Sequence, residues 1–82
     1  MFLHIGKDIT IKQEDLIAIL SIESILQKKR FEDICKSLNI HDKIIDVSDQ
    51  NIKSLILVKE NGEVKGYITN ISSTTLAKRA QI

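Results

Sequence analysis

Two apolar runs joined by the dipeptide Asn61-Gly62 constrain the fold of this chain more than any other feature. Asn-Gly is the strongest short-range hairpin signal, because both residues tolerate the positive φ angles of a tight turn between antiparallel strands. Residues 54–59 are almost entirely apolar, as in a strand buried on both faces, and residues 64–69 supply the returning strand. The sequence therefore predicts an antiparallel sheet built around this hairpin.

Further strands are predicted from alternating or continuous apolar residues. Residues 2–5 read as a strand that ends at Gly6, followed by a turn and a short strand at residues 9–12 with one solvated face. Residues 16–22 are nearly continuously apolar, which favours a central strand covered on both faces; a buried helix has the same pattern, but the isoleucine content favours the strand. Residues 43–47 suggest one more strand, ended by the polar segment 48–51.

A first helix is predicted after residue 23. Ser24 and Gln27 have the spacing of a capping box, and Asn39 is a suitable C-terminal stop. One apolar stripe follows the helical spacing i, i+3, i+4, i+7. It consists of Phe31, Ile34, Cys35 and Leu38.

A second, short helix is predicted close to the end of the sequence. Ser72 can cap it, and Ile71 can pack against Leu76 as a hydrophobic staple. Lys78 and Arg79 fall in the last turn, where the helix dipole favours positive charge. The expected architecture is α+β: a small, mostly antiparallel sheet with one amphipathic helix and a short C-terminal helix. With no proline, repeat or linker, residues 1–82 are expected to form a single domain.

The chain is unusually apolar for its length. It has 82 residues, 43% of them hydrophobic, with many isoleucines and no tryptophan. A domain of this size buries only roughly 60–65% of its unfolded surface, so some apolar surface is expected to remain for a partner. Self-association is the simplest use of that surface. The alternative is a coding bias toward Ile and Lys, which ten lysines against two arginines would also fit.

Charge and cysteine content exclude several classes of protein. A formal net charge of +1 gives no global attraction to nucleic acid or to anionic membranes, although charge can be segregated on one face. A single cysteine excludes an internal disulfide and a multi-cysteine zinc site. We see neither a signal peptide nor a membrane-spanning run, so a cytoplasmic protein without membrane contact is expected.

No catalytic or metal-binding pattern is found. His4 and His41 lack a metal-ligand spacing to each other or to Cys35, and structural or surface roles are expected for both histidines. Cys35 on the helix stripe is expected to behave as a small hydrophobe. The paired carboxylates at 14–15 and 32–33 look solvated, and the three glycines form no phosphate-binding motif. We therefore expect no enzyme activity, no cofactor, no metal and no small-molecule substrate.

The one basic run is Lys28-Lys29-Arg30. On a helix these residues spread over about 200° of the circumference, and acidic residues follow at 32 and 33. A solvated helix face is the simpler interpretation, and a phosphate-binding face is the alternative. The basic residues at 78 and 79 similarly complement the helix dipole first and could contact phosphate second.

Five segments together resemble one known family, the bacterial extracellular matrix regulatory proteins RemA and RemB. They are FLHIG at 2–6, DLIAI at 15–19, IDVS at 45–48, KSLIL at 53–57 and SSTTLAKRA at 72–80. The resemblance covers almost the whole chain and is closest to the RemB branch. It implies a regulator of biofilm-matrix genes, and the RemA branch implies a ring of small protomers that wraps DNA around a basic rim.

This sequence departs from the RemA-like pattern at the positions that the resemblance assigns to DNA. RemA-like members carry an arginine where this chain has Asp15, and an arginine pair where it has Gln50 and Asn51. Neither an amide nor a carboxylate replaces the guanidinium fork that binds phosphate. Any DNA contact would then fall to other basic residues. These candidates are Lys53, Lys12, Lys28, Lys29 and Arg30.

Two alternative functions therefore follow from the sequence. The first is a homo-oligomeric ring that regulates matrix genes and contacts DNA through a basic face. The second is an oligomeric scaffold that binds protein partners and no nucleic acid.

Overall fold

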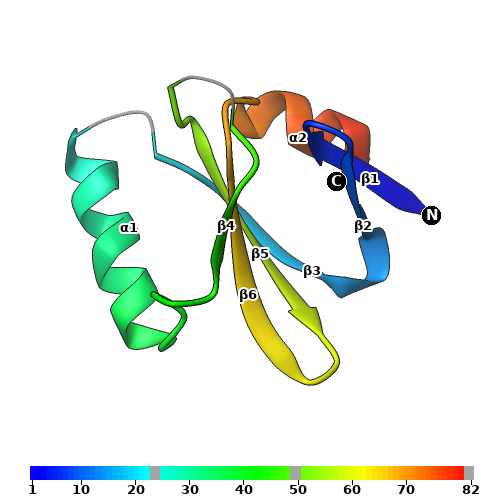
Figure 1. Ribbon diagram of the computed structural model, residues 1–82. Coiled ribbons are helices and arrows are strands. Elements are labelled where there is room, and N and C mark those ends of the chain that lie inside the picture. Colours follow the sequence, from blue (N-terminus) through cyan, green and yellow to red (C-terminus); the bar gives the residue numbers. More distant parts are fainter. Residues whose placement is uncertain (23–24, 49–50, 81–82) are drawn as a thin grey trace.

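The computed structural model of the protein describes residues 1–22, 25–48 and 51–80 (Figure 1). The strands are β1 (Phe2–Gly6), β2 (Ile9–Lys12), β3 (Leu16–Ser21), β4 (Ile44–Asp46), β5 (Ser54–Glu60) and β6 (Glu63–Thr69). The helices are the 3₁₀ turn η1 (Gln13–Asp15), α1 (Ile25–Ser37) and α2 (Ser73–Ala80). No helix among the described residues is long and apolar enough to span a bilayer.

A four-stranded sheet with the order β3-β5-β6-β4 forms the centre of the molecule. The predicted hairpin is confirmed: β5 and β6 pair antiparallel up to Glu60 opposite Glu63. Asn61 and Gly62 take φ angles of 52° and 80° in the turn. Both central turn residues thus have positive φ, as a two-residue hairpin with the right-handed strand twist requires.

The N-terminal strands form a separate two-stranded sheet, β1-β2, at the positions that the alternation predicts. Gly6 ends β1 with a φ of 139°. A side chain there would place its Cβ 2.7 Å from the backbone oxygen of Val47. Glycine at this position therefore allows both the left-handed backbone and the close approach of the hairpin to the end of β4.

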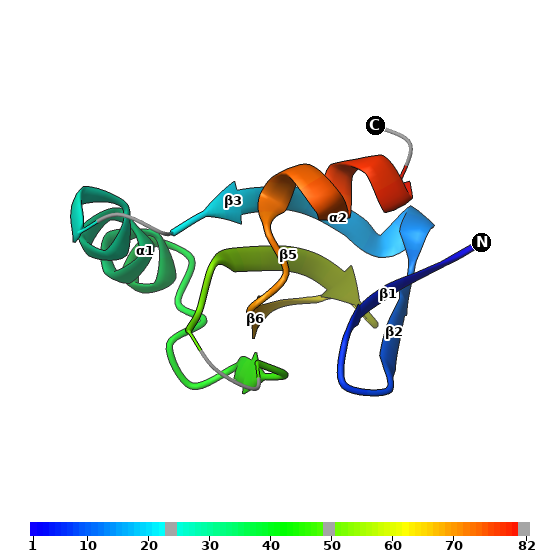
Figure 2. The same ribbon diagram turned by 90° about the horizontal axis from the view of Figure 1, so that it is seen from above.

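The sheet is covered on both faces (Figures 1 and 2). One core cluster joins the β1-β2 hairpin, α2 and the sheet residues Ile56, Val58 and Tyr67. A second cluster joins α1 to Leu55 and Leu57. Neighbouring residues of β5 thus point into different cores, which is why the central strand reads as a continuous apolar run.

Helix α1 ends at Ser37, and Asn39, with φ 56°, is the predicted C-terminal stop. The amide of Ile40 donates to the carbonyl of Cys35 (3.0 Å), and the amide of Asn39 donates to that of Lys36 (3.1 Å). This pair of bonds is a Schellman motif, with buried Ile40 and Cys35 in one core cluster. Ser24 of the predicted capping box lies outside the described residues.

The predicted apolar stripe of α1 is correct in part. Cys35 is buried, and Phe31 and Ile34 pack against the core. Leu38, in contrast, is 43% exposed. Leu38 directly follows the last residue of the helix, and although its amide still donates to the carbonyl of Ile34 (2.9 Å), its side chain lies outside the core clusters.

Helix α2 begins as the sequence predicts. The amide of Thr75 donates to the hydroxyl of Ser72 (3.2 Å), which makes Ser72 the N-cap. Leu76 is fully buried, and Ile71 packs against the same core cluster. The expected staple is consistent with this shared cluster.

The α+β class is confirmed, but the expected sheet was too simple. The described residues form two sheets with six strands, and β4 pairs with β6 in parallel. The cause is α1, which connects β3 to β4. A helix that crosses back over the sheet lets the next strand run in the same direction as the strand before it, so β4 runs parallel to β3 and hence to β6.

The prediction of a central strand at residues 16–22 is wrong. Strand β3 lies at the edge of the sheet, because the β5-β6 hairpin occupies the centre. The register with β5 shifts between Leu16 and Ala18, and Ile17 at this irregularity is 52% exposed. Strand β3 therefore has one unpaired edge in the described part of the chain, although its apolar run is long enough for a buried strand.

Candidate functional site

Lys53 is the best-positioned basic residue of those predicted to contact DNA. It is exposed just before β5, and its backbone is fixed on both sides. Its amide donates to the carbonyl of Thr69, and its carbonyl accepts from the amide of Ile22, both at 2.8 Å. Lys53 is therefore held at the end of the sheet where β3 ends and β5 begins.

Lys29 and Arg30 are exposed near the start of α1. Arg30 lines a cavity of about 220 Å³ together with Ser21 and Ile22, at the end of β3. Because the amide of Ile22 bonds to Lys53, the helix residues and Lys53 lie at the same end of the sheet. The structure thus places Arg30 and Lys53 at the same end of the sheet, with Lys29 adjoining Arg30 on α1; the side chain of Lys28 lies outside the described part.

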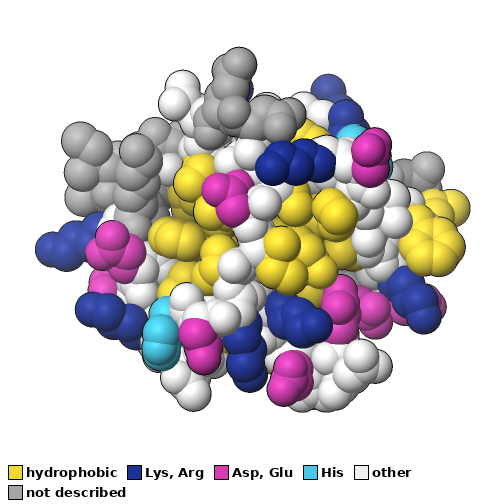
Figure 3. All heavy atoms as spheres, in the orientation of Figure 1, with side chains coloured by type: hydrophobic (Ala, Val, Ile, Leu, Met, Phe, Trp, Pro, Cys, Tyr) yellow, Lys and Arg dark blue, Asp and Glu magenta, His cyan; other side chains and the backbone are white. Residues whose placement is uncertain are grey.

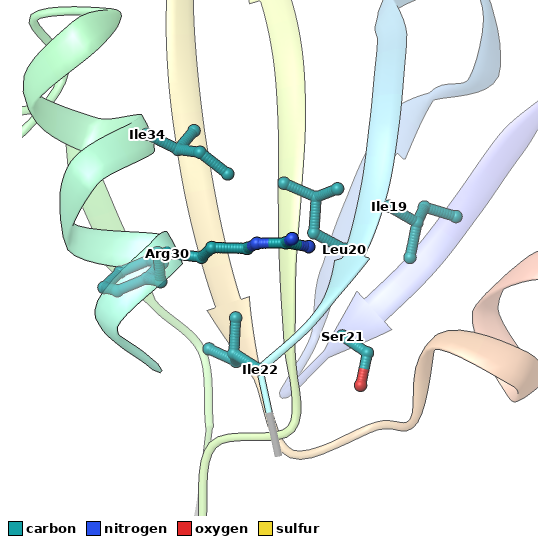
Figure 4. Close-up of a pocket in the computed structure, with 7 residues that line it drawn as sticks. Ile19, Leu20, Ser21, Ile22, Arg30 and Ile34 are labelled. Carbon is teal, nitrogen blue, oxygen red and sulfur yellow. The ribbon is translucent and has the colours of Figure 1, made fainter. Parts of the chain in front are cut away.

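The side chain of Arg30 does not point straight outward. Figure 4 shows it extending from α1 across the cavity toward Leu20 of β3. The rest of the lining is mainly apolar, including Phe31 and Ile34. Arg30 therefore places one positive charge over the exposed edge of the sheet.

Lys12 lies at the opposite end of the sheet. It ends β2, opposite Phe2 in the register, and lines a cavity of about 400 Å³ with Asp15, Glu60 and Asn61. Glu60 ends β5, whereas Lys53 precedes its first residue. The structure therefore separates Lys12 from the other candidates.

The two positions where family arginines are replaced are also separated. Asp15 lies at the end of the sheet that carries Lys12, and Asn51 lies at the end that carries Lys53. Gln50 is outside the described residues. Glu32 and Asp33 are exposed on α1 beside the basic residues, so the charge of this helix is mixed.

The exposed apolar residues are a feature that the sequence patterns did not locate. Figure 3 shows an apolar patch over the face that carries β4, surrounded by charges of both signs. Ile45 of β4 is 42% exposed and Ile17 of β3 is 52% exposed. Each edge strand of the central sheet therefore presents an isoleucine to solvent.

His4 is exposed on β1, and its ring contacts the turn that follows this strand and helix α2. Its Nε2 lies 2.7 Å from the carbonyl of Lys7, and its Nδ1 lies 3.4 Å from the Arg79 guanidinium. Nε2 must therefore carry the proton, so that Nδ1 can accept from Arg79. Nothing in the sequence could have indicated this contact, because the two residues are 75 positions apart.

Cys35 is buried, and burial raises the pKa of its thiol above the usual value. It packs in the core as a small hydrophobe, as expected. Within residues 1–22, 25–48 and 51–80, no three His, Cys, Asp or Glu side chains come together in a way that could hold a metal ion.

Comparison with known proteins gives one family. A family model described as RemA-like, extracellular matrix regulatory protein A-like, matches residues 2–80. This range includes every strand and both α-helices of the structure. It does not distinguish the RemA branch from the RemB branch, so the closer likeness to RemB stays a prediction. No curated protein matches the chain.

Proposed function

Since the chain belongs to the extracellular matrix regulatory protein A-like family, we propose that it regulates matrix genes from the cytoplasm as a homo-oligomeric ring that contacts DNA. The match over residues 2–80 carries this proposal, because it covers the whole described fold rather than one motif. The proposal includes no catalytic step and no cofactor.

Self-association is supported by the two edge strands. Open strand edges with exposed apolar side chains are sites where another chain can pair, and soluble monomers usually protect them with charges. Here Ile17 and Ile45 occupy these edges. A ring would cover both edges in every protomer.

DNA contact is supported by the grouping of basic residues at one end of the sheet. Lys53 and Lys29 are both exposed there. In a ring, one such group per protomer would repeat around the assembly. Since Asp15, Gln50 and Asn51 replace the arginines of RemA-like members, we expect binding that is weak and strongly dependent on salt.

The second candidate function is a protein-binding scaffold with no nucleic-acid contact. The observation that favours it is the mixed charge beside the basic group. Glu32 and Asp33 are exposed on the same helix as Lys29, and Asn51 takes the place of a cation close to Lys53. The two carboxylates would repel a phosphate backbone, and the amide of Asn51 would not bind it as an arginine does.

Two measurements test the proposal. Light scattering gives the mass of the wild-type chain, and gel-shift titration with duplex DNA at low and moderate salt gives the affinity. Lys53→Glu is expected to weaken binding most strongly. The slope of log K against log salt concentration should also become shallower by about one, as for the loss of one phosphate contact. Lys12→Glu makes the same charge change at the other end of the sheet and serves as the matched control.

The results separate the two functions. Salt-dependent binding that Lys53→Glu reduces more than Lys12→Glu supports the DNA-binding ring. An oligomer that shifts no DNA at either salt concentration supports the scaffold. A wild-type monomer at micromolar concentration would contradict both functions.

A further inference from the structure

Both edges of the central sheet are open in the described part of the chain. Strand β3 pairs only with β5, and β4 pairs only with β6. The backbone groups on the outer sides of β3 and β4 are therefore available to another strand.

The two edge strands run in the same direction. Strand β3 is antiparallel to β5, β5 is antiparallel to β6, and β4 is parallel to β6. When a second copy lies beside the first in the same orientation, its β4 is consequently parallel to β3 of the first copy. The C-terminal ends of the two strands then lie together.

Opposite charges occupy those C-terminal ends. Asp46 is the last residue of β4, and it is exposed. Arg30 lies over the end of β3, where it lines the cavity with Ser21 and Ile22 (Figure 4). A parallel pairing of β3 with β4 would therefore bring the carboxylate near the guanidinium.

The two charges also lie on the same face of the sheet. Asp46 is beside Ile68 in the register, and Ile68 belongs to the core cluster under α1. Leu20, toward which Arg30 extends, packs against that same cluster. Ile45 is beside Tyr67 of the other cluster, so it points to the opposite face, where Ile19 of β3 packs.

We propose that copies of this chain join edge to edge, β3 of one to β4 of the next, with Asp46 of the second copy paired to Arg30 of the first. The contact continues the sheet from one protomer to the next and places Ile45 against Ile19. Because it joins two different surfaces, it is heterologous, and successive copies close into a ring when the rotation between them allows it. The inference rests on the self-association proposed above and specifies its surfaces.

The positive charge of Lys7 acts on Asp46, but neither Asp46 nor Arg30 takes part in an ion pair among the described residues. The two ion pairs among these residues are Lys43–Glu63 and Lys65–Glu60. The Asp46 Oδ1 accepts bonds from the amide (2.8 Å) and hydroxyl (2.5 Å) of Ser48. These bonds hold the pKa of Asp46 below its usual value, so the group stays ionised.

Charge reversal tests the contact. Asp46→Arg and Arg30→Asp each place like charges in every interface, and each is expected to raise the dissociation constant of the assembly by about tenfold or more. The double variant Asp46→Arg/Arg30→Asp restores opposite charges and is expected to recover the wild-type mass. In an equimolar mixture of the two single variants, alternating copies are complementary at both interfaces, so oligomers should form again; a ring with an even number of copies recovers the full wild-type mass.

Two control variants change exposed charges near the same elements. Asp42→Arg lies in the turn before β4, and Lys29→Asp adjoins Arg30. Both are expected to keep the wild-type mass, measured by light scattering over a concentration series. Circular dichroism checks that every variant is folded.

The outcomes distinguish this contact from self-association in general. Loss of mass in both single variants with recovery in the double variant supports the edge contact. An oligomeric wild type whose mass none of the variants changes overturns the contact and leaves the proposed function standing. Single variants that dissociate without recovery in the double variant also overturn the Asp46–Arg30 pair, and a monomeric wild type overturns self-association itself.

Discussion

The Arg79 guanidinium donates a hydrogen bond of 3.2 Å to the backbone carbonyl of His4, which joins the last turn of α2 to the first strand. Nearby, the side-chain amide of Gln13 donates to the carbonyl of Ala80, the last residue of the helix. The bond from Gln13 gives a partner to one terminal carbonyl of α2, and the bond from Arg79 ties the same turn to β1. This relationship makes a direct prediction about stability.

Replacing Arg79 by alanine is expected to reduce the free energy of unfolding by about 0.5–1.5 kcal/mol, because the bond to the His4 carbonyl is lost. Lys78→Ala is the matched control, since it also removes a cation from the last turn of α2, and Lys78 makes no bond to the hairpin among the described residues. Urea denaturation measures both. Equal losses in the two variants would assign the effect to the helix dipole instead of the hairpin contact.

Gly6 and Gly62 both have positive φ, but only Gly6 is closely packed. Alanine at either position has the backbone penalty of about 1–2 kcal/mol. A Cβ at Gly6 also lies 2.7 Å from the Val47 backbone oxygen, whereas nothing lies within 4 Å of one at Gly62. Gly6→Ala is therefore expected to lose about 1–3 kcal/mol more than Gly62→Ala in thermal or urea unfolding. Similar losses would contradict the close packing of the hairpin on β4.

Asp46 is expected to make stability depend on pH in the acid range. Hydrogen bonds from the side chain and backbone of Ser48 lower its pKa in the folded chain below the usual 3.8. Ionised Asp46 therefore contributes stability above pH 3.8, and this contribution is lost as the pH falls through the folded-state pKa. Wild type should be more stable than Asp46→Asn at neutral pH.

The difference between the two proteins should decrease as the pH is lowered from about 5 to about 2. Urea unfolding at several pH values, at a protein concentration where both have the same mass, measures this difference. A difference that stays constant over this range would show that the bonds from Ser48 do not favour the charged form.

The Cys35 thiol should react slowly in the native protein. Burial raises its pKa, and the thiolate is the reactive form. Near pH 8, a chromogenic disulfide reagent is expected to react about tenfold or more slowly with the native chain than with the chain in denaturant. Cys35 is the sole cysteine, so Cys35→Ser supplies the blank. Equal rates in both conditions would place the thiol outside the core.

Local signals in the sequence predicted the elements well where a few neighbouring residues decide the structure. The Asn61-Gly62 turn, the Ser72 cap and the stop at Asn39 each depend on backbone angles or bonds within one turn. The structure confirms all three. Leu38 shows the limit of such patterns, because it has the helical spacing and the helical bond to Ile34, yet its side chain is exposed just beyond the last residue of α1.

The candidate site was predictable only in part. The sequence supplied the basic residues, but it could not show that Lys53 lies near Arg30 and far from Lys12. Their positions depend on which strand occupies the centre of the sheet. The apolar pattern at 16–22 is the same whether the strand is central or is an edge strand that a second copy would cover.

The sequence by itself determined the Asn61-Gly62 turn, the C-terminal stop of α1 and the N-cap of α2, since each depends on residues close together in the chain. It also determined the α+β class and the likeness to a family. Only the tertiary structure decided that β3 is an edge strand, that β4 is parallel to β6, and that Arg79 bonds to His4. The physical reason is that strand order results from pairing between distant segments, and the free energy of that pairing depends on the packing of the whole sheet.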